Sequence, residues 1–165
     1  MKLAQLLPAI ALLFCTSVLS AQKQLPDADL KTLDGATVNL SDYAQDGKVT
    51  VISFWATWCK PCQAELDAIA DMYPDWQEEY DMELVAITID TRRQLAKVKP
   101  LVESKQWEYT ILSDANNELR YALGFQSIPQ TYVLDKSGKI VWEHSGYVPG
   151  NEYELEEVVA KYAEK

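Results

Sequence analysis

The feature that most constrains this chain is a pair of cysteines, Cys59 and Cys62, placed between a strongly apolar run and an amphipathic segment. The run Val49–Trp55 is rich in β-branched and aromatic residues and lacks Gly and Pro, which predicts a buried central strand. Apolar residues recur at helical spacing over 63–80, so a helix is expected directly after the second cysteine. At the start of this helix, unpaired N–H groups and the helix dipole would stabilise a Cys59 thiolate and lower the pKa of its thiol.

The spacing of the two cysteines leaves three interpretations. A zinc site needs about four ligands, and only His144 remains to join the two thiols. An inert structural disulfide would close so small a loop that it removes little entropy from the unfolded chain. Thiol-disulfide exchange is favoured, with Cys59 as an exposed attacking sulfur and Cys62 as a shielded resolving sulfur. We therefore expect both cysteines to be catalytic, with no metal and no cofactor.

The N-terminus has the pattern of an export signal. A short basic start, an apolar run over 3–19 and small residues before a polar segment predict a signal peptide over 1–21, cleaved near Ala21. The domain would then occupy 22–165. An uncleaved membrane anchor and lipidation at Cys15 are the alternatives. Each version places the domain outside the cytoplasm, in the periplasm or at the extracytoplasmic face of the membrane.

Beyond the motif, strands and helices alternate along the chain. Pro74 and Pro100 are expected to kink or interrupt the helices that contain them. The alternation predicts an α/β fold with a central mixed sheet flanked by helices, and it places the cysteines at a strand end, where such sheets carry their sites. The expected elements are an N-terminal hairpin turning at 33–35, strands over 82–89, 109–112, 131–134 and 139–143, a helix from Asp90 to about Gln106, another capped at Ser113–Asp114 and ending near Gly124, and a last helix from Asn151.

Two segments carry a family resemblance. Phe54–Cys62 is similar to the active-site segment of thioredoxin-fold proteins, and Ser127–Ile140 resembles the cis-proline loop and hairpin of the exported TlpA/ResA-like branch, within the AhpC/TSA-redoxin-like proteins. The resemblance runs from about Leu25 to the C-terminus. It implies a thioredoxin-like fold with an N-terminal β-hairpin extension and an inserted strand-helix element around 84–106. It also implies the activity of a thiol-disulfide oxidoreductase.

The resemblance further implies a substrate-binding surface around Cys59. Pro129 would be cis and lie against the two thiols, which leaves the backbone of Ile128 free to pair with an extended substrate segment. An ordinary trans proline is the alternative. We assign the neighbours of Cys59, namely Trp58, Lys60 and Pro61, to the same surface. Trp58 is expected to shield the sulfurs, and Lys60 to stabilise the thiolate.

Glu65 is a third candidate catalytic residue. It follows Cys62 by three positions and therefore projects from the same helical face. The resemblance implies that it lies near the thiols, has a pKa raised by burial and relays protons to Cys62. A solvated helix carboxylate is the alternative. Thioredoxins proper carry an aspartate six residues before the first cysteine, and here that position is Ser53. His144 is expected on the final strand, without a catalytic role.

The expected function is reduction of protein disulfides outside the cytoplasm. As the resemblance implies, the substrate could be apocytochrome c in cytochrome c maturation, and a membrane reductant of the DsbD/CcdA type would restore the dithiol. A general disulfide oxidant or isomerase, a thiol-dependent peroxidase and a copper-binding chaperone are the alternatives. A net charge of −10 argues against nucleic acid as a partner.

Overall fold

The computed structural model describes residues 24–164, which form one seven-stranded sheet with helices on both faces. The expected signal peptide over 1–21 and the alternatives at Cys15 lie outside the described residues. The strands are β1 (Asp29–Thr32), β2 (Thr37–Asn39), β3 (Val49–Trp55), β4 (Met82–Thr88), β5 (Thr110–Ser113), β6 (Gln130–Leu134) and β7 (Ile140–Ser145). The helices are α1 (Ser41–Ala44), α2 (Lys60–Tyr80), the 3-10 helix η1 (Leu95–Lys97), α3 (Val98–Lys105), α4 (Glu118–Leu123) and α5 (Asn151–Ala163).

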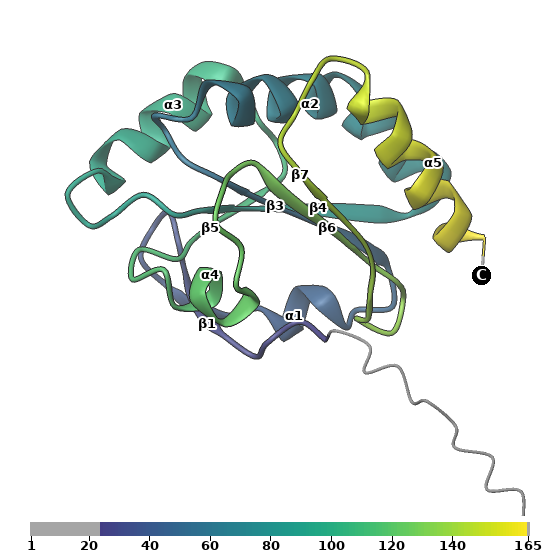
Figure 1. The fold of residues 1–165 in the computed structure, drawn as a ribbon, viewed down its shortest axis with the longest axis horizontal. Coiled ribbons are helices and arrows are strands. Elements are labelled where there is room, and N and C mark those ends of the chain that lie inside the picture. Colours follow the sequence, from purple (N-terminus) through teal and green to yellow (C-terminus); the bar gives the residue numbers. More distant parts are fainter. Residues whose placement is uncertain (1–23, 165) are drawn as a thin grey trace, which may run out of the picture.

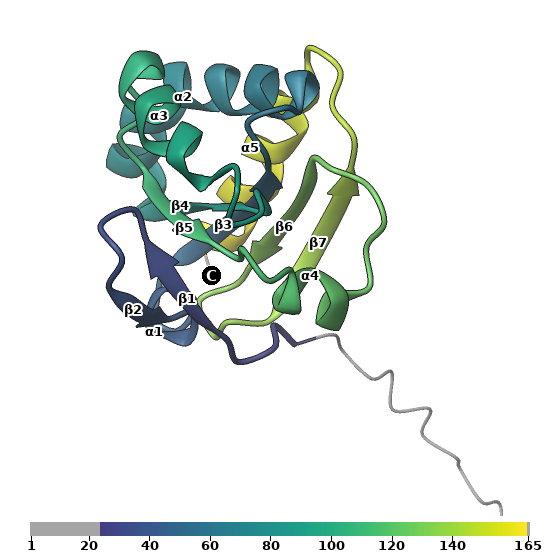
Figure 2. The same ribbon diagram turned by 90° about the vertical axis from the view of Figure 1, so that its left-hand side faces the viewer.

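The sheet is mixed, with strand order β2-β1-β5-β4-β3-β6-β7. The central strands β3, β4 and β5 run parallel, whereas β6 is antiparallel to β3 and β1 is antiparallel to β5. Figure 1 shows α2, α3 and α5 over one face of the sheet and α1 and α4 under the other. In the turned view of Figure 2, the β1–β2 hairpin lies at one edge and β7 at the other.

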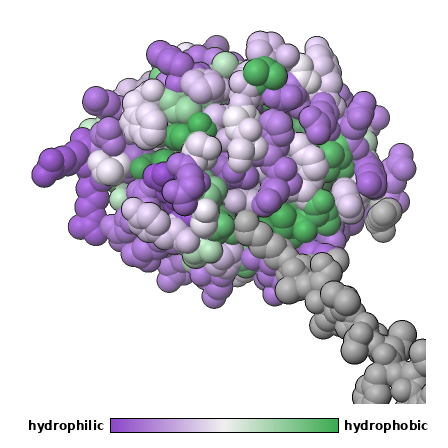
Figure 3. All heavy atoms as spheres, viewed as in Figure 1, coloured by the Kyte–Doolittle hydropathy of each residue, from purple (hydrophilic) through white to green (hydrophobic). Residues whose placement is uncertain are grey.

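The core lies along the middle strands. Every residue of β3 is buried, as the run of β-branched and aromatic residues predicted, because helices cover both of its faces. The face in Figure 3 is largely hydrophilic, with hydrophobic side chains gathered in small separate patches. Among residues 24–164, no helix is both long and apolar enough to cross a membrane.

Helix α2 differs from the sequence-based expectation at Pro74. The helix runs without interruption from Lys60 to Tyr80, so the expected interruption at Pro74 is not found. Tyr73 and Trp76 on either side are buried, and their packing against the sheet holds this turn in place despite the missing hydrogen-bond donor. Pro61 lies in the first turn of α2, where no N–H partner is needed.

The segment after β4 also contains less helix than expected. No helix begins at Asp90; a turn leads instead into η1, and α3 begins at Val98. The Asp90 carboxylate is engaged elsewhere, as described below, and therefore does not cap a helix. Pro100 falls in the first turn of α3, where its missing N–H costs no helical hydrogen bond, so it permits the start of this helix rather than dividing one.

Several turn predictions are confirmed. Asp114 caps α4 by accepting the N–H groups of Glu118 and Arg120 at 2.9 and 3.0 Å. The helix ends at Gly124 in the left-handed conformation. The β6–β7 hairpin turns at 135–138, where Gly138 has a φ of +79°. Helix α1, a single turn, was not expected.

Candidate active site

The two cysteines lie where β3 ends and α2 begins, and they form a disulfide in this structure. Cys59 is the N-cap residue of α2, with extended backbone, and its sulfur accepts the backbone N–H of Cys62 at 3.3 Å. A side chain in this position takes up one of the unpaired N–H groups at the start of a helix. The geometry places Cys59 Sγ at the positive end of the α2 dipole, as the motif predicted.

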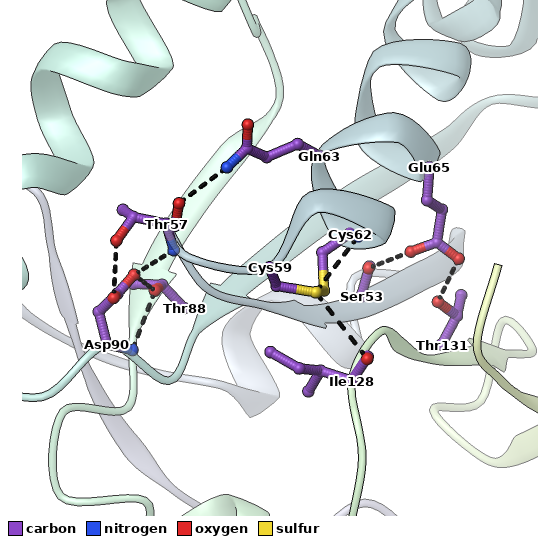
Figure 4. Close-up of a disulfide and its surroundings, with 10 residues drawn as sticks. All are labelled: Ser53, Thr57, Cys59, Cys62, Gln63, Glu65, Thr88, Asp90, Ile128 and Thr131. Carbon is purple, nitrogen blue, oxygen red and sulfur yellow. Dashed lines mark hydrogen bonds between the residues drawn. A yellow bond between two sulfur atoms is a disulfide. The ribbon is translucent and has the colours of Figure 1, made fainter.

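The exposure of the two sulfurs differs less than expected. Cys59 is 5% exposed and Cys62 is fully buried. Cys59 Sγ is bonded to Cys62 and lies 3.8 Å from the carbonyl oxygen of Ile128, so little of the residue reaches solvent in the disulfide form. Figure 4 shows this arrangement, with the disulfide between the start of α2 and the Ile128 loop.

The loop before β6 forms the second wall of the site. The Ile128–Pro129 peptide bond is cis, Pro129 is buried, and Ile128 is half-buried. The carbonyl of Pro129 accepts the N–H of Gly146 at 2.8 Å, which fixes the loop against the end of β7. The backbone N–H of Ile128 makes no hydrogen bond to another residue of the described chain. An unpaired N–H beside a sulfur leaves a position where a polypeptide backbone can bind.

Glu65 is buried beneath the site, at 5% exposure. Ser53 donates a hydrogen bond to Glu65 Oε2, and Thr131 donates one to Oε1, both at 2.9 Å. These two hydroxyls come from β3 and β6, so the carboxylate lies between the two strands that carry the cysteines and the Ile128 loop (Figure 4). Burial raises the pKa of Glu65 to about 7, although both hydrogen bonds act in the opposite direction. The alternative of a solvated helix carboxylate is excluded.

Asp90 is a residue of the site that sequence reasoning missed. It is fully buried, and its carboxylate accepts hydrogen bonds from the backbone N–H and the hydroxyl of Thr57 at 2.7 and 2.9 Å. The hydroxyl of Thr88 donates a third, at 2.8 Å. On the other side, Gln63 donates to the carbonyl of Thr57 at 2.8 Å. The loop that leads to Cys59 is therefore fixed from β4 and from α2 (Figure 4).

A signal for Asp90 is present in the sequence. Asp90 follows a buried strand that is parallel to β3 and adjacent to it. The ends of neighbouring parallel strands meet at one edge of a sheet, so an acidic residue there lies beside the cysteine loop. The expected helix start at Asp90 gave no indication that its carboxylate would contact the cysteine loop.

The remaining candidates are the chain neighbours of Cys59, and their side chains are exposed. Trp58 is 58% exposed, so most of its side chain faces solvent beside the cysteines. Lys60 and Pro61 are also exposed. The side chain buried under the motif is that of Trp55, which packs edge-to-face against Trp107 with ring centroids 5.1 Å apart.

His144 lies on β7, stacked on Trp142 at 5.5 Å between ring centroids. Across residues 24–164 no three His, Cys, Asp or Glu side chains are grouped closely enough to bind a metal ion.

Comparison with known proteins identifies the family. The AhpC/TSA family matches residues 21–143. The thiol-disulfide oxidoreductase ResA of Bacillus thuringiensis is 30% identical over 124 residues, which is 75% of this chain and 69% of that protein. The thioredoxin-like protein YneN of Bacillus subtilis is 32% identical over 135 residues, covering 80% of this chain and 75% of YneN.

A solved structure supports the same fold. The solution structure of a thioredoxin-like protein from Porphyromonas gingivalis superposes with a TM-score of 0.75 at 41% identity, over 85% of this chain and 92% of that one. The expected thioredoxin-like fold is thereby confirmed, including the N-terminal hairpin beside β5 and the inserted strand-helix element. The chain belongs to the AhpC/TSA family and is a thioredoxin-fold thiol-disulfide oxidoreductase of the TlpA/ResA-like branch.

Proposed function

We propose that the protein is an exported reductant of protein disulfides whose chemistry runs through Cys59 and Cys62. One observation carries the proposal: Cys59 Sγ accepts an N–H group at the start of α2 and lies 3.8 Å from the Ile128 carbonyl. A sulfur in this position has a stabilised thiolate and stands next to backbone that can hold an incoming polypeptide.

The reaction proceeds in two exchanges. In the reduced protein, the Cys59 thiolate attacks one sulfur of the substrate disulfide, forming a mixed disulfide and releasing the other substrate sulfur as a thiolate. The Cys62 thiolate then attacks Cys59 Sγ. This second exchange closes the Cys59–Cys62 disulfide found in the structure and releases the substrate as a dithiol. The two electrons that reduce the substrate come from the two protein thiols.

The Ile128 loop and the neighbours of Cys59 bind the substrate. The unpaired N–H and the carbonyl of Ile128 form hydrogen bonds with an extended substrate segment, as in strand addition. Buried Pro129 holds this backbone against the sulfurs. Exposed Trp58, Lys60 and Pro61 contact the substrate on the other side of Cys59.

Glu65 accepts the proton that Cys62 loses before the second exchange. A carboxylate with a pKa of about 7 is close to half protonated at neutral pH and can take up and return a proton. Its hydrogen bonds go to Ser53 and Thr131 and not to a sulfur, so the proton passes through a water molecule or through a hydroxyl. The role of Glu65 is therefore to tune the resolving cysteine.

The sequence pattern and the family resemblance support a proposed physiological setting. A signal peptide over 1–21 would export the domain 22–165 to the periplasm or to the extracytoplasmic face of the membrane. A membrane reductant of the DsbD/CcdA type would return electrons to the Cys59–Cys62 disulfide. Apocytochrome c is the substrate that we propose, as part of cytochrome c maturation.

Trapping with a Cys62→Ser variant tests this function. The variant can perform the first exchange and not the second, so substrate proteins should accumulate as mixed disulfides on Cys59 in the native host. They should dissociate on addition of dithiothreitol. A Cys59→Ser variant is the matched control, because it retains a buried Cys62 and should capture nothing.

Absence of Cys59-dependent adducts would contradict the mechanism. The direction of electron flow is tested by the reduction potential of the Cys59–Cys62 pair. A potential close to that of strong periplasmic oxidants, about −120 mV, would contradict the assignment as a reductant.

A further inference from the structure

A shallow groove adjoins the active-site loop on the side of the inserted element. It has a volume of about 420 Å³ and is formed by the loop before Cys59 together with η1 and the start of α3. Trp58 forms one wall at 58% exposure, directly beside Cys59 in the chain. Whatever fills the groove therefore lies next to the reacting disulfide. The residues that line it are Thr57, Trp58, Gln94, Lys97, Pro100 and Leu101.

The groove has a charge opposite to that of the rest of the chain. Lys97 is the one charged residue of its lining. The segment 92–105 holds five of the 15 Lys and Arg residues of a chain with net charge −10, and a single carboxylate, Glu103. Asp90, although close in sequence, is fully buried and directs its carboxylate to Thr57 and Thr88.

Part of this positive charge has no partner within the protein. Lys99 forms an ion pair with Asp34 at 2.8 Å, and Lys105 forms one with Asp67. Arg93 and Lys97 are exposed, and neither forms an ion pair with any carboxylate of residues 24–164. Exposed cations without an ion pair are available to a binding partner.

We propose that this groove binds an acidic, extended segment of the substrate polypeptide next to its disulfide. The proposal rests on the disulfide reductase function above and names the substrate class. The exposed indole of Trp58 and the apolar atoms of Pro100 and Leu101 receive side chains, while Lys97 attracts carboxylates in the groove. Arg93, exposed in the turn next to the lining residue Gln94, adds a second positive charge. A local cationic surface offsets the repulsion that an acidic substrate meets from the molecule as a whole, and so raises the association rate.

Two matched disulfide peptides test the proposal. They share one sequence, and one carries aspartates and the other lysines beside the disulfide. The second-order rate constant for reduction by the reduced full-length protein is measured by stopped flow at low ionic strength. We expect the acidic peptide to react about 10-fold faster. An Arg93→Glu/Lys97→Glu double variant should lose or reverse this ratio.

Lys136→Glu is the control variant. Lys136 is also an exposed cation without an ion pair among residues 24–164, and its Nζ donates to the carbonyl of Ala163. It lies beside Gly47 and Tyr80, at the opposite end of the sheet from Cys59. It should keep the wild-type ratio. Equal rates for the two peptides, or an equal change of ratio in the control, would overturn the groove proposal.

An uncharged disulfide, bis(2-hydroxyethyl) disulfide, separates this result from failure of the proposed function. If the wild-type protein reduces the uncharged disulfide and does not discriminate between the peptides, only the groove proposal fails. If it reduces none of the three disulfides, the reductase function itself fails.

Discussion

Asp90 holds Thr57 by two hydrogen bonds, one to its backbone N–H and one to its hydroxyl, at 2.7 and 2.9 Å. Thr57 precedes Cys59 by two residues, so a carboxylate on the adjacent strand end fixes the path of the chain into the motif. Gln63, one residue after Cys62, holds the carbonyl of Thr57 at 2.8 Å. The segment that carries the attacking sulfur is therefore clamped at its entry by residues outside the Cys-x-x-Cys motif.

Asp90→Asn should loosen this clamp. An amide replaces one of the two accepting oxygens with a donor. In place of Oδ1 this donor faces the Thr57 hydroxyl, and in place of Oδ2 it faces the Thr57 N–H and the Thr88 hydroxyl. We expect a loss of about 1–3 kcal/mol in the free energy of unfolding, measured by urea denaturation of the oxidised protein. Amide hydrogen exchange at Thr57 and Trp58 should accelerate. Thr57→Val, which removes one hydrogen bond of the set, should cost less; an equal or larger loss in that variant would contradict the clamp.

Glu65 should make stability depend on pH. Burial raises its pKa from 4.5 to about 7, so between these values the folded protein holds a proton that the unfolded chain has released. The contribution of Glu65 to the free energy of unfolding should therefore be largest below pH 4.5 and fall as the pH rises through 7, by on the order of 3 kcal/mol. Glu65→Gln should flatten the curve and be more stable than the native protein at pH 8.

Glu83 provides the matched comparison for Glu65. Burial and the nearby Asp46 also raise the pKa of Glu83 to about 7, but Glu83 lies near the start of β4, paired with Thr50 and remote from the sulfurs. Glu83→Gln should alter the pH dependence of stability and leave the pH profile of disulfide reduction unchanged. Glu65→Gln should alter both. Identical reduction profiles for the two variants would remove Glu65 from the mechanism.

Gly138 and Gly35 should respond differently to alanine. Both have positive φ, at +79° and +87°, so each substitution carries the cost of a left-handed alanine, about 1 kcal/mol. At Gly138 a Cβ would also lie 2.7 Å from the carbonyl oxygen of Ala44 in α1, whereas nothing lies within 4 Å at Gly35. Thermal unfolding should show a clearly larger loss for Gly138→Ala. Equal losses would contradict the close approach between α1 and the hairpin.

Alanine substitutions of Trp58 and Trp107 should separate effects on substrate binding from effects on folding stability. Trp58 is 58% exposed and Trp107 is 5% exposed. Trp107 packs against Trp55 and donates its Nε1–H to Asp67 at 3.0 Å. Trp107→Ala should therefore cost about 3–5 kcal/mol in the free energy of unfolding. Trp58→Ala should change stability by less than about 0.5 kcal/mol, yet slow the reduction of protein disulfides. A large loss of stability in Trp58→Ala would show a structural role instead.

The sequence was informative wherever a property is local. The β-branched run Val49–Trp55 predicted the central strand, and the strand patterns over 131–134 and 139–143 predicted the last hairpin, because neighbouring residues decide both. The position of Cys59 at the start of a helix was predictable for the same reason. Pro74 misled because the packing of α2 against the sheet outweighs the local cost of a proline within it.

Properties that depend on contacts between distant segments were harder to predict. Helical spacing put Glu65 on the same face as Cys62. The hydrogen bonds to its buried carboxylate come from Ser53 and Thr131, on two different strands. Thr131 is 66 residues away in sequence. Asp90 was expected to begin a helix, and its contact with Thr57, 33 residues earlier, was not predicted. Both pairs become evident only when the strand order is known.

The bridge between Gln24 and Lys139 has a practical consequence for handling the protein. Lys139 follows the turn after β6, at the end of the sheet where Leu134 pairs with Thr50, whereas the disulfide follows the opposite end, where Gln130 pairs with Phe54. The first described residues therefore join the sheet at the end opposite the Cys59–Cys62 disulfide. A protein immobilised or fused through its N-terminal side would therefore be attached at the end of the sheet opposite the disulfide, and its active site would face the solution.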